Sequence, residues 1–177
     1  MNFYQEDNCF TKQENKIIDE ILYSKEFPVF YYKDQVIGDG IPFFSHVLIT
    51  KDTHEINSNY ANFFLGIAYR YISKVSKLEP KQFLRGNINL TLPFKGKPKL
   101  HVDHEEPHYQ IIMYLNNASG TTDIYKDKKL FKKVNPKKGR IIMFDKQPHL
   151  ANSPTGEDEL RAVCVMTFNT NLTIFNI

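Results

Sequence analysis

The second half of the chain, from Gln82 onward, consists of short apolar runs separated by turn residues, and it lacks helical periodicity. Runs of this kind are typical of antiparallel strands, and their close spacing favours a sandwich or a jelly roll. This pattern limits the fold more than any other feature of the sequence. We predict strands at 83–92, 100–103, 109–115, 121–125, 130–134, 140–144 and 161–168.

The first half supplies the helices of the predicted fold. The segment Thr11-Lys12-Gln13-Glu14 has the form of a capping box, and the apolar residues that follow it at helical spacing predict a helix that ends before Pro28. A longer helix is predicted at 56–78, because an apolar stripe recurs there and Pro80 closes it. The expected fold class is α+β, mainly β: a double-stranded β-helix (jelly roll, cupin-like) with two supporting N-terminal helices. Two further strands are expected at 29–32 and 43–50.

Length and composition indicate one globular domain. The chain has 177 residues, of which 41% are hydrophobic and 24% charged, and this fits a single core. We expect one domain over 1–177, with helical support at about 1–80 and the jelly-roll core at about 81–170. No apolar run approaches the ~20 residues of a membrane helix, and the N-terminus lacks signal-peptide features. Two cysteines without a CxxC spacing favour a cytoplasmic protein without a disulfide scaffold.

A histidine and a carboxylate stand two residues apart at His101 and Asp103. On a strand, such a pair projects to one face, so that both side chains can reach the same metal ion. His149 follows the apolar run 140–144 and can supply a third ligand from another strand. Two imidazoles and one carboxylate suit non-haem Fe(II) and leave three coordination positions open. The sequence therefore predicts an iron site at these three residues.

The segment His104-Glu105-Glu106-Pro107-His108 matches the letters of the HExxH zinc-protease motif. That chemistry requires a helix, which places the two histidines one turn apart. Pro107 would lie inside this helix at a cost of about 3 kcal/mol, because it lacks the N–H and clashes with the preceding turn. We interpret the match as accidental and expect surface or structural roles for His46, His54, His104 and His108.

Arg161 opens a predicted strand twelve residues after His149, in a chain with far more lysine than arginine. A guanidinium binds a carboxylate bidentately, whereas lysine offers a point charge. Arg161 can therefore bind an anionic ligand. The alternative is a surface ion pair with Glu157, Asp158 or Glu159.

The formal net charge of +3 is unevenly distributed, with many lysines between Lys126 and Lys138 and three more at Lys95, Lys97 and Lys99. Such clusters are typical of a solvated hairpin tip and loop. The alternative is a basic rim that faces an acidic substrate such as nucleic acid.

From about Arg85 to Phe168, the order of these motifs resembles the 2-oxoglutarate- and Fe(II)-dependent oxygenases, in particular the prolyl 4-hydroxylase-like branch. The sequence departs from that pattern at Ile124, where the family often has Phe, and in the long spacing from His149 to Arg161. The motifs that carry the resemblance are His101-Val102-Asp103, Tyr114-Leu115-Asn116, Gly120-Thr121-Thr122-Asp123-Ile124, Pro136-Lys137-Lys138-Gly139-Arg140 with Phe144, His149 and Arg161.

The resemblance implies a dioxygenase that uses Fe(II), 2-oxoglutarate and O2, forms succinate and CO2, and is stimulated by ascorbate. It implies that His101, Asp103 and His149 bind the metal, with no catalytic residue beyond them. Arg161 would pair with the distal carboxylate of 2-oxoglutarate, and Tyr114 would donate its hydroxyl to the same carboxylate. The expected substrate is a prolyl-type side chain of a peptide or protein. A nucleobase oxygenase and a non-catalytic jelly-roll binding or structural protein stay open, as do the substrate-binding residues and the oligomeric state.

Overall fold

The computed structural model describes residues 1–157 and 159–170. Strands dominate the described residues, and the two helices lie in the first half, so the prediction of a mainly β fold with two N-terminal helices is confirmed. The elements follow in the order β1 (Phe3–Glu6), α1 (Lys12–Leu22), β2 (Phe30–Tyr32), β3 (Phe43–Ile49), α2 (Ala61–Val75), β4 (Pro80–Thr91), β5 (Tyr109–Tyr114), β6 (Thr122–Lys126), β7 (Lys129–Val134), β8 (Ile141–Asp145), β9 (His149–Ala151) and β10 (Arg161–Thr170).

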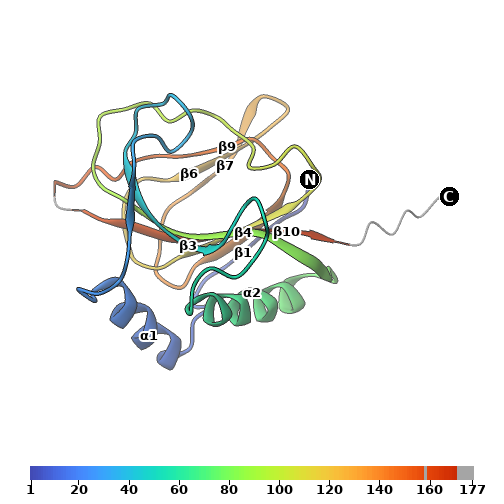
Figure 1. The fold of residues 1–177 in the computed structure, drawn as a ribbon. Coiled ribbons are helices and arrows are strands. Elements are labelled where there is room, and N and C mark those ends of the chain that lie inside the picture. Colours follow the sequence, from blue (N-terminus) through green and yellow to red (C-terminus); the bar gives the residue numbers. More distant parts are fainter. Residues whose placement is uncertain (158, 171–177) are drawn as a thin grey trace.

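The strands form two antiparallel sheets that face each other (Figure 1). The larger sheet has seven strands in the order β1-β8-β5-β10-β4-β3-β2, and the smaller has three in the order β7-β6-β9. Both helices cover the face of the large sheet that points away from the small one (Figure 1). The first 80 residues therefore supply three strands of the large sheet as well as the supporting helices.

The central strands β5, β8 and β10 of the large sheet contribute buried apolar side chains to both of its faces. Alternate residues of a strand point to opposite sides, and β5 divides its side chains in this way. Ile111 and Met113 join the core beneath the helices, together with Phe64 of α2. Ile112 and Tyr114 join a second cluster between the two sheets. This double burial explains why the strands appear as nearly continuous apolar runs in the sequence.

The helix boundaries differ in part from the prediction. The capping box of α1 is confirmed, since the Glu14 backbone N–H donates to Thr11 Oγ1 at 3.1 Å and the Thr11 N–H donates to Glu14 Oε2 at 2.8 Å. The helix ends at Leu22, well before Pro28. Helix α2 begins at Ala61 and not at residue 56, because the Asn57 N–H donates to the Leu48 carbonyl and holds this segment against β3.

The predicted strand at 100–103 is wrong. Only His101 pairs there, in an isolated antiparallel bridge with His149, and Asp103 lies in a bend. The two short strands β1 and β9 were not predicted. Among the helices of the described residues, none has both the length and the apolar composition needed to span a membrane.

Candidate active site

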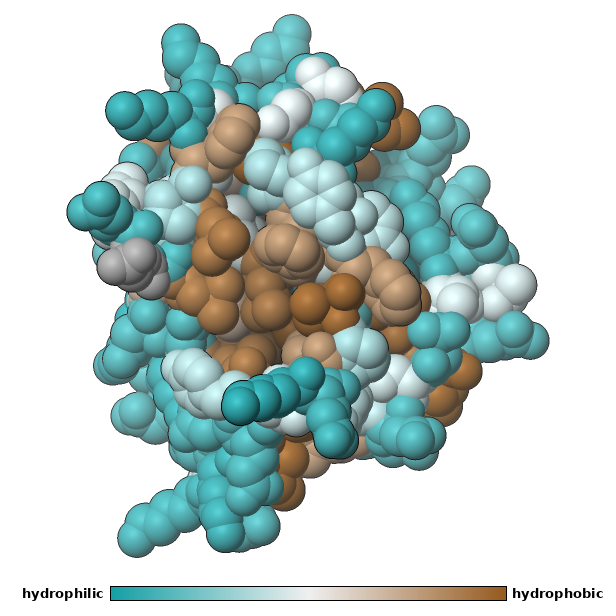
Figure 2. Space-filling model, turned by 60° about the vertical axis from the view of Figure 1, so that its left-hand side comes forward, coloured by the Kyte–Doolittle hydropathy of each residue, from teal (hydrophilic) through white to brown (hydrophobic). Residues whose placement is uncertain are grey.

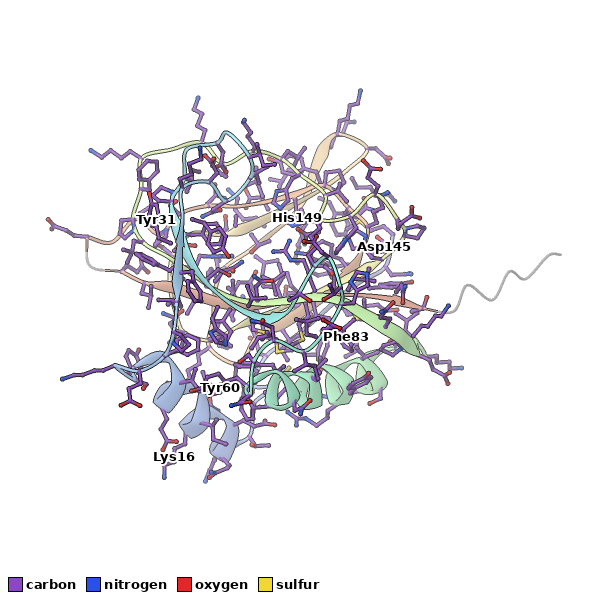
Figure 3. The ribbon with its side chains drawn as sticks, in the orientation of Figure 1. Lys16, Tyr31, Tyr60, Phe83, Asp145 and His149 are labelled. Carbon is purple, nitrogen blue, oxygen red and sulfur yellow. The ribbon has the colours of Figure 1, made fainter. Side chains whose placement is uncertain are left out.

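The three predicted metal ligands lie together. His101 and Asp103 lie in the segment between β4 and β5, His149 begins β9, and their ligand atoms are all within 4.8 Å of one another. The backbones of the two histidines hold each other, since each N–H donates to the other's carbonyl at 3.0 and 2.9 Å. Figure 3 shows His149 between the two sheets. The local structure is therefore a paired backbone bridge and not the strand face that the sequence predicted.

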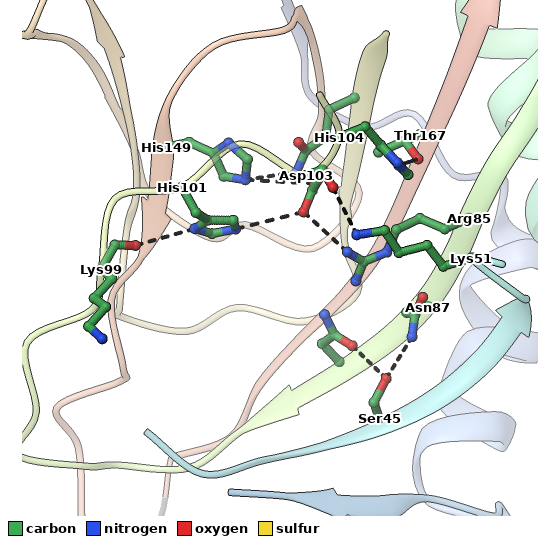
Figure 4. Close-up of polar contacts among 12 residues, drawn as sticks. Ser45, Lys51, Arg85, Asn87, Lys99, His101, Asp103, His104, His149 and Thr167 are labelled. Atoms are coloured by element: carbon green, nitrogen blue, oxygen red, sulfur yellow. Dashed lines mark hydrogen bonds and ion pairs between the residues drawn. The ribbon is translucent and has the colours of Figure 1, made fainter. Parts of the chain in front are cut away.

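Hydrogen bonds orient both imidazoles towards the carboxylate. His149 Nδ1 lies 3.0 Å from the Gln147 carbonyl, and His101 Nδ1 lies 3.2 Å from the Lys99 carbonyl, so each Nδ1 carries the proton and donates it. The Nε2 atoms are then free to accept, and they lie 3.9 and 3.7 Å from the carboxylate oxygens of Asp103 (Figure 4). A metal-binding histidine typically donates its other ring N–H in this way, which fixes its tautomer and its orientation.

The donor atoms fit a divalent metal ion. Asp103 Oδ2 is buried and has no hydrogen-bond partner among the described residues, although a buried polar atom normally has one. Two unprotonated imidazole nitrogens and this carboxylate oxygen form the donor set that suits Fe(II). His101, Asp103 and His149 would therefore hold such an ion.

Two cations that the sequence analysis did not assign to the site contact Asp103. Arg85 of β4 donates from Nη1 to Asp103 Oδ1 at 3.1 Å, and Lys51 donates from Nζ to the Asp103 carbonyl at 3.0 Å (Figure 4). Burial raises the pKa of Asp103, but nearby positive charge, that of Arg85 foremost, outweighs it and lowers the pKa to about 2. The carboxylate is therefore ionised at neutral pH, as a metal ligand must be.

The two ring nitrogens of His149 need opposite roles, and the surroundings of the ring favour the neutral form that this requires. Burial lowers the pKa of His149 to about 4, although the charge of Asp103 acts in the other direction. Gln110 points its amide Nε2 at His149 Nε2 from 3.2 Å, which marks that nitrogen as an acceptor. A neutral imidazole with an unprotonated Nε2 is the form that binds metals.

The three candidate metal ligands and Arg161 line the same cavity, which has a volume of about 330 Å³. Arg161 is 3% exposed and begins β10. Its Nε donates to the Gly120 carbonyl and its Nη2 to Thr122 Oγ1, both at 2.8 Å. The described residues include no carboxylate that pairs with it. Burial disfavours an unpaired charge, and it lowers the pKa of this guanidinium.

The alternative assignment of Arg161 to a surface ion pair does not hold for the residues that the structure describes. Glu159 instead accepts hydrogen bonds from Ser119 and from the Gly156 N–H. Glu157 is exposed, whereas Arg161 is buried. Asp158 lies outside the described residues.

Tyr114 lies beside Arg161 but does not line the cavity. Its side chain is fully buried, and its hydroxyl donates to Thr122 Oγ1 at 2.8 Å. Its predicted contact with 2-oxoglutarate stays a prediction.

Thr122, in contrast, does line the cavity, and its hydroxyl accepts hydrogen bonds from both Tyr114 and Arg161. Because a hydroxyl has two lone pairs and one proton, the Thr122 proton is left to donate to a ligand. Thr122 belongs to the turn motif 120–124, but its residue type alone did not indicate this role.

The remaining histidines have structural partners, as expected. His104 Nε2 lies 2.8 Å from Thr167 Oγ1, and His108 Nδ1 lies 2.8 Å from the Glu106 carbonyl. The segment between them is not helical, so the HExxH match lacks the geometry of a zinc protease. His46 and His54 contact backbone carbonyls.

Gly120 is required where the chain passes Arg161. It has a φ of +77°, and an added Cβ would lie 2.5 Å from the Asn152 carbonyl oxygen and 2.8 Å from Pro154 N. We expect Gly120→Ala to lower the free energy of unfolding by about 1–3 kcal/mol through backbone strain, with the steric clash adding to that loss. Chemical denaturation measures the change.

Gly66→Ala is the matched control for this substitution. Gly66 lies in α2, where an added Cβ meets no atom within 4 Å, so this variant should gain up to about 1 kcal/mol. Equal stability of the two alanine variants would contradict the assigned role of Gly120.

Comparison with solved structures places this site in a known fold. A 2OG-Fe(II) oxygenase family oxidoreductase from Burkholderia pseudomallei matches with a TM-score of 0.74 at 14% identity, over 94% of this chain and 84% of that chain. The fold is that of the 2-oxoglutarate- and Fe(II)-dependent oxygenases. The predicted resemblance is therefore confirmed at the level of the fold.

Two further structures with the oxygenase fold carry ligands. A prolyl hydroxylase in complex with a hypoxia inducible factor peptide fragment, from Trichoplax adhaerens, has a TM-score of 0.64 and 13% identity, over 95% of this chain and 83% of that chain. HygX from Streptomyces hygroscopicus, with nickel, 2-oxoglutarate and hygromycin B bound, has a TM-score of 0.66 and 10% identity, over 96% and 83%. No protein-family model matches the sequence, and no curated protein sequence matches it.

Proposed function

We propose that this protein is a 2-oxoglutarate- and Fe(II)-dependent dioxygenase that hydroxylates a peptidyl, prolyl-type side chain. One observation carries the proposal: a buried guanidinium without a carboxylate partner among the described residues lines the same cavity as a histidine–carboxylate–histidine cluster. A dicarboxylic co-substrate satisfies both features, because one end can bind the metal and the other can pair with Arg161.

In this proposal each side chain has a defined task. His101, Asp103 and His149 hold the iron, and Arg161 and Thr122 bind the distal carboxylate of 2-oxoglutarate. Tyr114 supports Thr122 from behind the cavity wall, or donates to the carboxylate itself after rotation. The bound metal supplies the oxidation of 2-oxoglutarate by O2 to succinate and CO2, coupled to hydroxylation of the substrate. HygX, which binds nickel and 2-oxoglutarate, supports this assignment by its fold.

The sheets are proposed to form the two halves of a double-stranded β-helix, with the cavity between them. The second cluster of apolar residues lies between the sheets, and side chains from both sheets line the cavity. Two facing sheets with a cavity between them support the proposed jelly roll.

A peptide is the favoured substrate. The cavity is lined in part by the apolar residues Val36, Ile37 and Phe43, and Figure 2 shows a hollowed apolar area on the side of the molecule where β2 lies. An exposed apolar area beside a cavity is typical of a binding surface. The prolyl hydroxylase with a bound peptide supports the same choice.

The lysine-rich segment gives little support to a nucleic-acid substrate. Lys133, Lys137 and Lys138 form ion pairs with Asp123, Asp7 and Asp19. None of the lysines between 126 and 138 lines the cavity. The segment forms the β6–β7 hairpin, which agrees with the interpretation as a solvated hairpin.

The purified protein should convert 2-oxoglutarate to succinate when Fe(II) is present, and should fail to do so with Zn(II) in its place. The reason is that only a redox-active metal can use O2 in the proposed site. Succinate formation, measured under air with and without substrate, is the readout.

A panel of prolyl peptides and single-stranded DNA then tests the substrate. We expect peptides to stimulate turnover and DNA to have no effect. Absence of succinate in every condition, together with no binding of 2-oxoglutarate to the Mn(II)-loaded protein, would contradict the proposed function. Stimulation by DNA that weakens steeply with salt would replace the peptide with a nucleic acid.

A further inference from the structure

The cavity carries more positive charge than iron and 2-oxoglutarate require. Its lining includes three cations, Lys51, Arg85 and Arg161, and one carboxylate, Asp103. A divalent metal ion and a dianionic co-substrate cancel each other, so the excess of cations persists in the loaded site. Arg161 is buried, Arg85 is half-buried and Lys51 is exposed at the mouth of the cavity, and a cleft lined by charges of one sign raises the local concentration of the opposite charge. The excess therefore indicates a further anion.

Two of these cations lie directly at a metal ligand. Lys51 reaches Asp103 from the turn after β3 and Arg85 reaches it from β4, and Figure 4 shows the two side by side. Nearby positive charges disfavour the binding of a cation. The positive charges of Lys51 and Arg85 beside Asp103 therefore lower the affinity for a metal ion unless another group offsets them.

Neither cation is saturated by the contacts it makes. Lys51 donates one hydrogen bond, to the neutral Asp103 carbonyl, and forms no ion pair among the described residues. Arg85 donates to Asp103 from Nη1 only, although a guanidinium has five N–H donors. Donors of both side chains therefore remain for a ligand in the cavity.

Lys51 also lies where the first cavity meets a second one, into which a bound substrate could extend. It lines a second cavity of about 790 Å³, which shares Val102 and Asp103 with the first and is also lined by Glu105, Glu106 and Lys146. A substrate whose reactive carbon lies at the metal can therefore extend past Lys51 into this second cavity. An anionic group on such a substrate would lie against Lys51 and Arg85.

We propose that Lys51 and Arg85 form a subsite for an oxyanion of the primary substrate, a carboxylate or a phosphate, next to the carbon that is hydroxylated. This inference rests on the proposed function and adds the substrate class to it: the substrate is anionic close to its reactive position. For a peptide, an acidic side chain or the C-terminal carboxylate supplies the group.

The test compares anionic probes with neutral twins on the full chain loaded with Mn(II) and saturating 2-oxoglutarate. The two pairs are N-acetylproline with N-acetylprolinamide, and thymidine 5′-monophosphate with thymidine. Calorimetric titration should show an anionic probe binding about 10- to 150-fold more tightly than its twin, the range for a hydrogen bond to a charged group. The pair that shows this preference identifies the oxyanion as carboxylate or phosphate.

Lys51→Gln separates charge from structure, because glutamine keeps a donor for the Asp103 carbonyl but carries no charge. It should reduce the preference by about tenfold or more, whereas Lys12→Gln, the same change at an exposed position of α1, should keep the wild-type ratio. If Lys51→Gln fails to load 2-oxoglutarate, Arg85→Lys, which keeps the charge, should retain the preference, and its loss there would count against the subsite.

Equal affinities within both pairs, or no binding by either anionic probe, would overturn the subsite. An undiminished preference in Lys51→Gln would do the same. Binding of 2-oxoglutarate to the Mn(II)-loaded wild-type protein is measured first. Its failure would contradict the proposed function, whereas 2-oxoglutarate binding without an anion preference would contradict the subsite alone.

Discussion

Asp103→Ala should lower the affinity for Mn(II) or Fe(II) by more than about 100-fold and abolish succinate formation. Loss of an outer-shell partner already costs 10–100-fold in metal affinity, and this substitution removes a ligand itself. It also leaves Arg85, which pairs with Asp103 at 3.1 Å, as an uncompensated cation at the site. Equilibrium dialysis at increasing metal concentrations measures the affinity for the ion.

Asp52→Ala is the control for the loss of one negative charge. Asp52 is exposed in the turn next to Lys51, so its removal changes the local field without removing a ligand. Its metal affinity should stay within a few-fold of wild type, since exposed charges are screened. Wild-type metal affinity in Asp103→Ala would show that the ion binds elsewhere.

Arg161→Met should weaken 2-oxoglutarate by about 10- to 150-fold, because a hydrogen bond to a charged group contributes about 1.5–3 kcal/mol. The guanidinium lies inside the cavity and has no carboxylate partner among the described residues, so the co-substrate is its counter-ion in the proposed complex. Titration of the Mn(II)-loaded protein with 2-oxoglutarate gives the dissociation constant.

Two further variants separate the effect of the Arg161 charge from that of the guanidinium geometry and control for the loss of an arginine elsewhere. Arg161→Lys keeps the charge but not the planar fork, and should fall between wild type and Arg161→Met. Arg70→Met removes a guanidinium that pairs with Glu14 on the helical side of the sheet, and should leave the 2-oxoglutarate affinity unchanged. An unchanged affinity in Arg161→Met would remove this residue from the co-substrate site.

Local patterns in the sequence predicted most of the framework. Period-two and continuous apolar runs located β4, β5, β8 and β10, because each of these strands is long enough to show its burial pattern. Thr11 and Glu14 identified the start of α1, since a capping box is a contact between near neighbours. The three-residue strand His149–Ala151 is too short for any periodicity, and it was missed.

The sequence predicted that His101, Asp103 and His149 would lie together, but it did not predict the geometry that brings them there. His101 and Asp103 converge although they do not share a strand, because the backbone bridge to His149 holds them. Arg85 and Lys51 could not be assigned, since their contacts with Asp103 depend on how β4 and the turn after β3 approach a distant loop. Such long-range convergence leaves no periodic signal in the chain.

The His101–His149 bridge joins parts of the molecule that the hydrogen-bonded ladders leave separate. His149 belongs to the small sheet, whereas Asp103 is anchored through Arg85 to β4 of the large sheet. An ion bound by all three ligands would cross-link β9 of the small sheet to β4 of the large sheet. Iron occupancy would then govern how often the two sheets part, and chelation would speed amide hydrogen exchange in β9 before it affected the helices. The metal would then stabilise the contact between the two sheets in addition to its proposed chemical role.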